Sequence, residues 1–162
     1  MTDEARPVRD NPIQVGETAP EFSLKDQNIE DWTLSDHVMQ SDVVLCFYPM
    51  DFSPVCSTEM ECITAEMQRF TDAGATVVGI SCDSFFTHKA WAEQLNLSQT
   101  LLADMHRDVC RAFGFFFPDL NVAARGTVVI GQSDDGVGTV KWVQARELGS
   151  GMDAEELLAA LS

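Results

Sequence analysis

The sequence of 162 residues is poor in basic side chains and contains no C-x-x-C motif. Only 3 lysines and 7 arginines stand against 26 acidic residues, and the formal net charge is −16. Such a charge repels polyphosphate backbones and leaves no basic stripe, so we expect no nucleic-acid partner. The missing C-x-x-C argues against a zinc ribbon and against a general dithiol-disulfide oxidoreductase.

Long apolar runs are also missing. No stretch approaches the roughly 20 apolar residues of a membrane-spanning helix, and the opening MTDEARPVRDNP is too polar and acidic for a secretory signal. We therefore expect a cytoplasmic protein without a membrane partner. The acidic excess is spread along the chain, as on a halophile's protein, where salt screens self-repulsion. An ordinary acidic protein is the alternative.

Cysteine is present in an odd number, five, spread through regular secondary-structure patterns. This differs from the paired framework of a small secreted scaffold, so we expect reduced thiols at rest. With 45% hydrophobic residues the chain can bury a core without disulfide or metal staples. We predict one domain over residues 1–162, with residues 1–15 as a mobile N-terminal segment.

The hydrophobic pattern predicts an α/β domain with a mixed central sheet flanked by helices. Residues 19–36 alternate around a polar centre, as a β-hairpin does. The run 43–49 is continuously apolar and rich in β-formers, which is typical of a strand buried on both faces. The other expected elements are helices at 54–72, 85–95, 105–113 and 153–161, and strands at 75–81, 101–103, 126–131 and 137–146.

Cys56 lies where the helix at 54–72 should begin. Ser53 is a good N-cap and Pro54 suits the first helical position, which places Cys56 at N3. A thiolate there meets unpaired N–H groups and the positive end of the helix dipole. The position also follows the carboxyl edge of strand 43–49, where α/β folds bind ligands. The alternative is a small buried side chain, as most isolated cysteines are.

A reactive thiolate needs a positive partner, and Arg125 is the candidate. It directly precedes the apolar strand 126–131, so its side chain should lie at the lip of the sheet. A surface salt bridge is the alternative role. The remaining arginines fit ordinary solvated positions; they are Arg6, Arg9, Arg69, Arg107, Arg111 and Arg146.

The run 47-FYPMDFSPVCSTE-59 resembles the active-site segment of the peroxiredoxins, Pro-x-x-x-Thr/Ser-x-x-Cys after a strand. The resemblance implies a thioredoxin-like fold with an N-terminal β-hairpin extension. The nearest branch is the one-cysteine alkyl hydroperoxide reductase-like branch of the alkyl hydroperoxide reductase and thiol-specific antioxidant type. Further matching segments follow in family order: 18-TAPEFSL-24, 76-TVVGISCDS-84, 87-THKAW-91 and 124-ARGTVVI-130.

The resemblance implies a thiol-dependent peroxidase without cofactor or metal. Cys56 would attack hydrogen peroxide or a small organic hydroperoxide and become a sulfenic acid. Ser53 would hydrogen-bond the peroxide, Arg125 would stabilise the developing charge, and Pro49 would shield the thiolate from water. Glu59 would orient Arg125; a carboxylate that only complements the helix dipole is the alternative.

Cys62 is the candidate resolving thiol. It lies six residues after Cys56, about 9 Å along an intact helix, whereas a disulfide wants α-carbons within about 7 Å. We therefore favour a one-cysteine cycle completed by an external thiol or a thioredoxin- or glutaredoxin-like reductant over a two-cysteine cycle. A non-enzymatic redox sensor or holdase is a further alternative. Packing is the expected role of Cys46, Cys82 and Cys110.

A histidine, a tryptophan and a run of phenylalanines also have predicted roles. We expect His88 to be a helix-surface or interface histidine instead of a base or metal ligand. Trp91 should pack in the core or at the rim of the site. The run 115-FFFP-118 fits an apolar collar, a dimer contact or plain core packing. The family resemblance implies a homodimer or higher homo-oligomer.

Overall fold

The computed structural model describes residues 8–161. Seven strands form one sheet in the order β2-β1-β5-β4-β3-β8-β9. The central strands β3, β4 and β5 are parallel, and the remaining pairs are antiparallel. The mixed sheet is therefore confirmed. Its strands are β1 (Ser23–Asp26), β2 (Asp31–Thr33), β3 (Asp42–Phe47), β4 (Ala75–Ser81), β5 (Thr100–Ala103), β8 (Gly126–Ile130) and β9 (Val140–Ala145).

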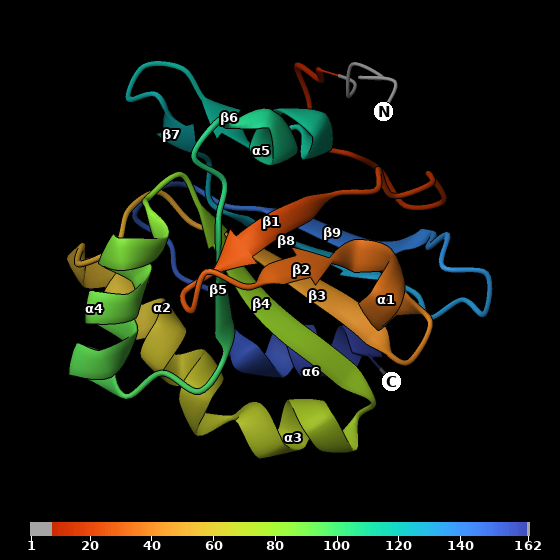
Figure 1. Ribbon diagram of the computed structural model, residues 1–162. Helices are drawn as coiled ribbons and strands as arrows, with labels where there is room; N and C mark the ends of the chain where they lie inside the picture. Colours follow the sequence, from red (N-terminus) through yellow and green to blue (C-terminus); the bar gives the residue numbers. More distant parts are fainter. Residues whose placement is uncertain (1–7, 162) are drawn as a thin grey trace.

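Helices cover both faces of this sheet (Figure 1). One face carries α2 (Pro54–Ala65), α3 (Met67–Asp72), α4 (Phe85–Leu95) and α6 (Ala154–Leu161). The other carries α1 (Leu34–Val38) and α5 (Asp108–Phe113), with the hairpin of β6 (Phe116–Phe117) and β7 (Val122–Ala123) beside α5. Because both faces are covered, β3 and β8 are buried almost throughout, as their apolar sequences predict.

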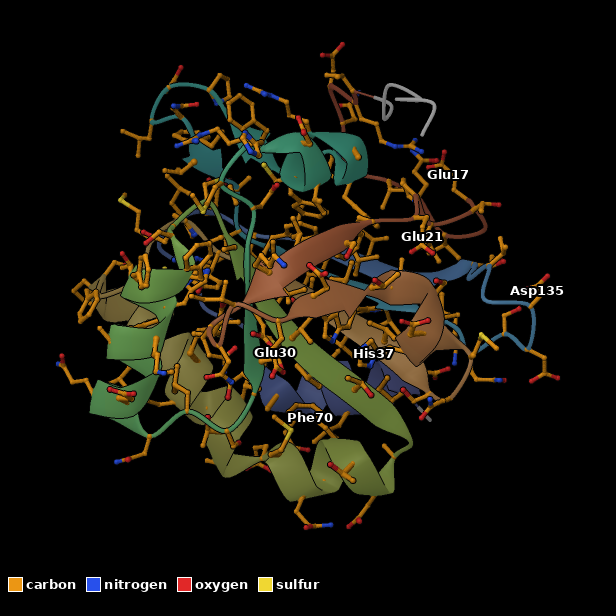
Figure 2. The ribbon with its side chains drawn as sticks, viewed as in Figure 1. Glu17, Glu21, Glu30, His37, Phe70 and Asp135 are labelled. Carbon is orange, nitrogen blue, oxygen red and sulfur yellow. The ribbon has the colours of Figure 1, made fainter. Side chains whose placement is uncertain are left out.

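Two apolar cores lie on the two sides of the sheet. Phe70, labelled in Figure 2, projects from α3 into the core beneath the sheet and is fully buried. Cys56 belongs to this same core. Phe113 and Phe115 belong to the core on the opposite face, where Phe115 stacks on Phe47 with ring centroids 5.1 Å apart. Of the three roles left open for residues 115–118, core packing therefore holds for Phe115.

The predicted elements are confirmed except in three places. The helix expected over 54–72 is two helices, because Glu66 leaves the helical region with φ −100° and ψ 7°. The short helix α1 was not expected, since its five residues give no clear helical period. The hairpin of β6 and β7 was missed for the same reason, because each of its strands has only two residues.

Residues 9–13 pack against α5. The Ile13 side chain is 1% exposed, and its N–H donates to the Phe113 carbonyl oxygen at 2.9 Å. Arg9 Nε donates to the Ala112 carbonyl oxygen at 2.9 Å. Part of the segment 1–15, expected to be mobile, is thus tied to the fold, and residues 1–7 lie outside the described residues. Over residues 8–161, no helix combines the length and apolarity needed to cross a membrane.

Candidate active site

The turn from β3 into α2 places Cys56 as the sequence predicts. Pro49 is buried directly after the strand, and Phe52 adopts the left-handed region with φ 68° to complete the turn. Ser53 is the N-cap and Pro54 the first helical residue, so Cys56 is at N3. The Cys56 side chain is fully buried. It therefore lies at the positive end of α2 and out of bulk water.

Arg125 is in direct contact with this thiol. Gly126 pairs with Phe47 in the sheet, so the residue before β8 lies at the same edge as the loop after β3. Arg125 Nη2 donates to Cys56 Sγ at 3.1 Å, and Nε donates to the Leu148 carbonyl oxygen at 3.0 Å. The residue is only 2% exposed. The surface salt bridge held as the alternative is wrong, and a fixed guanidinium faces the sulfur.

Glu59 lies behind Arg125 on the first turns of α2. Its Oε1 accepts from Arg125 Nη1 at 3.2 Å, and its Oε2 accepts from Arg146 Nη2 at 3.2 Å and from the Met152 N–H at 2.7 Å. The carboxylate is therefore more than a group that complements the helix dipole. The prediction of a solvated Arg146 is wrong, because its side chain is 7% exposed and joins this network.

A small pocket opens beside these groups. It has a volume of about 180 Å³, and it is lined by Pro49, Ser53 and Arg125 together with Met50, Pro54, Val55, Leu120 and Leu148. Ser53 Oγ donates its proton to the Met50 carbonyl oxygen at 3.0 Å. Its lone pairs remain able to accept a hydrogen bond from a bound molecule. Three of the sequence-predicted residues thus line one cavity, next to the thiol that Arg125 contacts.

Sequence comparison decides the family. Residues 15–142 match the AhpC/TSA family. The chain belongs to this family, the peroxiredoxins. It is 32% identical over 155 residues to alkyl hydroperoxide reductase E of Mycobacterium tuberculosis, covering 93% of this chain and 99% of that protein. The 2-Cys peroxiredoxin BAS1 of Hordeum vulgare is 31% identical over 91% of this chain and 73% of its own length; the chain covers 58% of its Spinacia oleracea counterpart.

Solved peroxiredoxin structures share the fold. The peroxidoxin BcpB of Mycobacterium tuberculosis superposes with a TM-score of 0.81 at 28% identity, over 92% of this chain and 96% of that one. The reduced 2-Cys peroxiredoxin of Plasmodium vivax gives 0.82 at 27% identity, over 93% and 81%. The thioredoxin-like fold is confirmed. As a peroxiredoxin, the chain is a thiol-dependent peroxidase, an oxidoreductase.

The peroxiredoxin loop is anchored by a buried polar cluster that the sequence reading missed. His88, expected on a helix surface or at an interface, is fully buried. Its Nδ1 lies 2.6 Å from Asp51 Oδ2, and its Nε2 lies 3.0 Å from the Leu102 carbonyl oxygen. Tyr48 Oη donates to Asp51 Oδ1 at 2.7 Å. His88 is buried because Asp51 turns into the protein and contacts α4, and no local sequence pattern predicts this contact.

The hydrogen bonds of this cluster follow from its partners. His88 Nε2 donates to the Leu102 carbonyl oxygen, because a carbonyl oxygen can only accept, and Nδ1 shares a hydrogen bond with Asp51 Oδ2. Burial raises the pKa of Asp51, while the hydrogen bond from His88 opposes that shift. Burial and the Asp51 carboxyl raise the pKa of Tyr48 well above its usual value, so its hydroxyl stays a donor. The cluster ties the loop that carries Asp51 to α4 and β5.

Two further cysteines lie on the same face as Cys56. Cys46 is fully buried in β3, where burial raises the pKa of its thiol to about 12, and it is a core residue as expected. Cys62 is partly exposed on α2. Burial, followed by the charges of neighbouring carboxylates, raises the pKa of Cys62. Trp91 is buried and donates to Ser57 Oγ at 3.3 Å, which confirms its packing role.

Proposed function

We propose that the Cys56 thiolate reduces hydrogen peroxide and small organic hydroperoxides. Cys56 Sγ attacks one peroxide oxygen and the O–O bond breaks. The other oxygen leaves as water or an alcohol after it takes up a proton, and Cys56 becomes a sulfenic acid. The observation that carries this proposal is the 3.1 Å contact from Arg125 Nη2 to Cys56 Sγ at the N-terminus of α2.

The neighbouring residues have distinct proposed roles. Arg125 stabilises the thiolate and the negative charge that develops on the leaving oxygen. The Ser53 hydroxyl, whose proton is donated to Met50, accepts the hydrogen bond of the peroxide O–H. Pro49 shields the sulfur from water. Glu59 positions Arg125. Fixed donors of this kind act without reorganisation during the reaction, and the loss of one typically costs about 2.7–4 kcal/mol of barrier.

The size of the pocket supports small substrates. Its volume of about 180 Å³ is below the roughly 300–1,000 Å³ of pockets that hold drug-sized ligands. Its lining is mostly apolar apart from Ser53 and Arg125. Hydrogen peroxide and short-chain hydroperoxides are therefore the substrates that we propose.

We propose a one-cysteine cycle with an external reductant. Cys56 and Cys62 lie six residues apart within the continuous helix α2, so a bond between them requires its first turns to unwind. A small thiol or a thioredoxin- or glutaredoxin-like protein would then return Cys56 to the thiol.

Mass spectrometry after one equivalent of peroxide tests the proposal. In the presence of dimedone, we expect one adduct on the tryptic peptide 26–69, lost in Cys56→Ser and retained in the matched control Cys62→Ser. A disulfide within this peptide, formed faster than dimedone can react, would overturn the one-cysteine cycle. An adduct that survives in Cys56→Ser would overturn the role of Cys56. Peroxide consumption that stops after one turnover despite added dithiothreitol would favour the redox sensor instead.

A further inference from the structure

Two cysteines that the reaction at Cys56 does not use lie beside each other. Cys82 directly follows β4, and Cys110 lies in α5. Their Sγ atoms are 3.9 Å apart. Cys110 is fully buried, whereas Cys82 is partly exposed. The sequence predicts packing roles for both. The two cysteines are 28 residues apart in the sequence, so their contact arises only from the fold.

The pair is separated from Cys56 by the central sheet. Side chains alternate between the two faces along a strand, and Cys82 continues the series of Val78 and Ile80 into the core that contains Cys110. Cys56 belongs to the core on the opposite face. Figure 1 shows the same arrangement, with α5 above the sheet and α2 below it. Neither cysteine of the pair can therefore reach the Cys56 sulfur while the sheet is intact.

We propose that Cys82 and Cys110 form a second redox site, a thiol pair that peroxide oxidises to an intramolecular disulfide independently of Cys56. The Cys82 thiolate attacks one peroxide oxygen, the O–O bond breaks, and the other oxygen leaves as water after protonation. The Cys110 sulfur then attacks the sulfenic sulfur of Cys82. The S–O bond breaks, and the hydroxide leaves as water with the Cys110 proton. In total, two thiols lose two hydrogens and one peroxide becomes two waters.

The surroundings distinguish the two sulfurs. The hydrogen bond with Cys110 lowers the pKa of Cys82, and the charge of Arg107 lowers it further, against burial and the charge of Asp104. The hydrogen bond with Cys82, together with burial, raises the pKa of Cys110. Cys82 is also the more accessible of the two. It is therefore the thiol that meets peroxide first, and Cys110 is the thiol that resolves it.

The distance is suited to bond formation. A disulfide bond is about 2.05 Å long, so the sulfurs must approach by about 1.9 Å from their 3.9 Å separation. Cys82 lies just beyond the end of β4, outside the ladder of the sheet, where a change in its side-chain rotamer breaks no strand pairing. Closure needs no unwinding of a long helix, unlike a bond between Cys56 and Cys62.

A metal site is the competing explanation. Ligand atoms of Cys82, Asp104 and Cys110 lie within 4.8 Å of one another. However, both oxygens of Asp104 already accept backbone hydrogen bonds, from the Val109 N–H at 3.2 Å and the Cys110 N–H at 2.8 Å. A structural zinc site also needs four ligands, and among the described residues this group offers three. These observations favour the disulfide.

The test uses the full chain carrying Cys56→Ser, so its result is independent of the proposed function. This variant keeps four of the five cysteines. It is treated with hydrogen peroxide, its free thiols are alkylated under denaturing conditions, and it is digested with trypsin. Cleavage after lysine and arginine separates Cys82 (peptide 70–89), Cys110 (peptide 108–111) and the remaining cysteines (peptide 26–69). We expect peptides 70–89 and 108–111 to be linked, two hydrogens lighter than their sum, and separated by dithiothreitol.

Three comparisons complete the test. The number of free thiols should fall from four to two. Adding Cys62→Ser, a matched control for a partly exposed thiol on the other face, should leave the link unchanged. Adding Cys110→Ala should abolish the link and leave a dimedone-reactive sulfenic acid on Cys82. The proposal is overturned if both thiols are still alkylated after peroxide treatment of the folded protein, or if the purified protein contains stoichiometric zinc bound by this pair.

Discussion

Replacing Glu59 by glutamine should weaken both the fold and the reaction. The carboxylate is 2% exposed and accepts hydrogen bonds from Arg125, Arg146 and the Met152 N–H. Glutamine keeps the shape but removes the charge, and its NH₂ group must face at least one of these donors. Breaking a buried ion pair by removing one partner costs about 3–5 kcal/mol. We expect the free energy of unfolding to fall by about this amount, because solvent screens these groups little.

Glu59→Gln should lower the rate of peroxide reduction less than the removal of a hydrogen-bond donor would. Removing one preorganised donor typically lowers the rate by about 100- to 1,000-fold. Arg125 keeps its hydrogen bond to the Leu148 carbonyl oxygen at 3.0 Å in Glu59→Gln, so its guanidinium is only partly released. We therefore expect the second-order rate constant for peroxide to fall by less than this range, but measurably.

Urea denaturation and stopped-flow oxidation by peroxide measure the two effects. The matched control is Glu155→Gln, which removes a carboxylate from the exposed ion pair with Arg69 and should change neither quantity measurably. A double-mutant cycle tests whether Glu59 acts on the rate by positioning Arg125 or by stabilising the fold as a whole. If it acts through Arg125, Glu59→Gln should have no further effect on the rate in an Arg125→Met background. Additive rate losses, or a Glu59→Gln enzyme as fast as the wild type, would refute the role of Glu59.

Three other variants or conditions give defined outcomes. Arg125→Met should reduce the rate of peroxide oxidation by about 100- to 1,000-fold in stopped-flow measurements, and a near-normal rate would remove it from the reaction. His88→Leu leaves Asp51 Oδ2 and the Leu102 carbonyl oxygen buried without their histidine partner, so urea denaturation should show a loss of about 1–3 kcal/mol; an unchanged free energy of unfolding would contradict the buried hydrogen bonds. The thiolate fraction rises as pH passes the pKa, so iodoacetamide should alkylate Cys82 with a midpoint below pH 9.0 and Cys62 with one above it, and the reverse order would contradict the assigned shifts.

The sequence predicted those parts of the site that local chemistry determines. The N-cap and the proline placed Cys56 at N3, and the apolar strand placed Arg125 at the edge of the sheet. The partners of these residues depend on tertiary contacts instead. Arg146, the residue after β9, reaches Glu59, and His88 reaches Asp51 from α4, across separations of 87 and 37 residues. No spacing or propensity reports such contacts, so Arg146 was predicted as solvated and His88 as a helix-surface or interface residue.

The same distinction explains the fold. Long segments with a clear apolar or helical pattern, such as β3, β4 and α4, were predicted within a residue or two at each end. The strands β6 and β7 have only two residues each, too few to show the alternation of side chains that predicts a strand. The contact between Cys82 and Cys110 arises only when β4 and α5 meet on one face of the sheet. The sequence alone therefore does not predict that these two cysteines are neighbours.

The most direct measurement is the rate of a single turnover with peroxide in wild type, Cys56→Ser, Cys62→Ser and Cys82→Ser. Each protein is mixed with one equivalent of hydrogen peroxide in a stopped-flow instrument, and the disappearance of peroxide is followed. We expect a fast phase in the wild type and in the Cys62 and Cys82 variants, and its complete loss in Cys56→Ser. A Cys56→Ser protein that keeps the fast phase would contradict the assignment of Cys56 as the thiol that reduces peroxide.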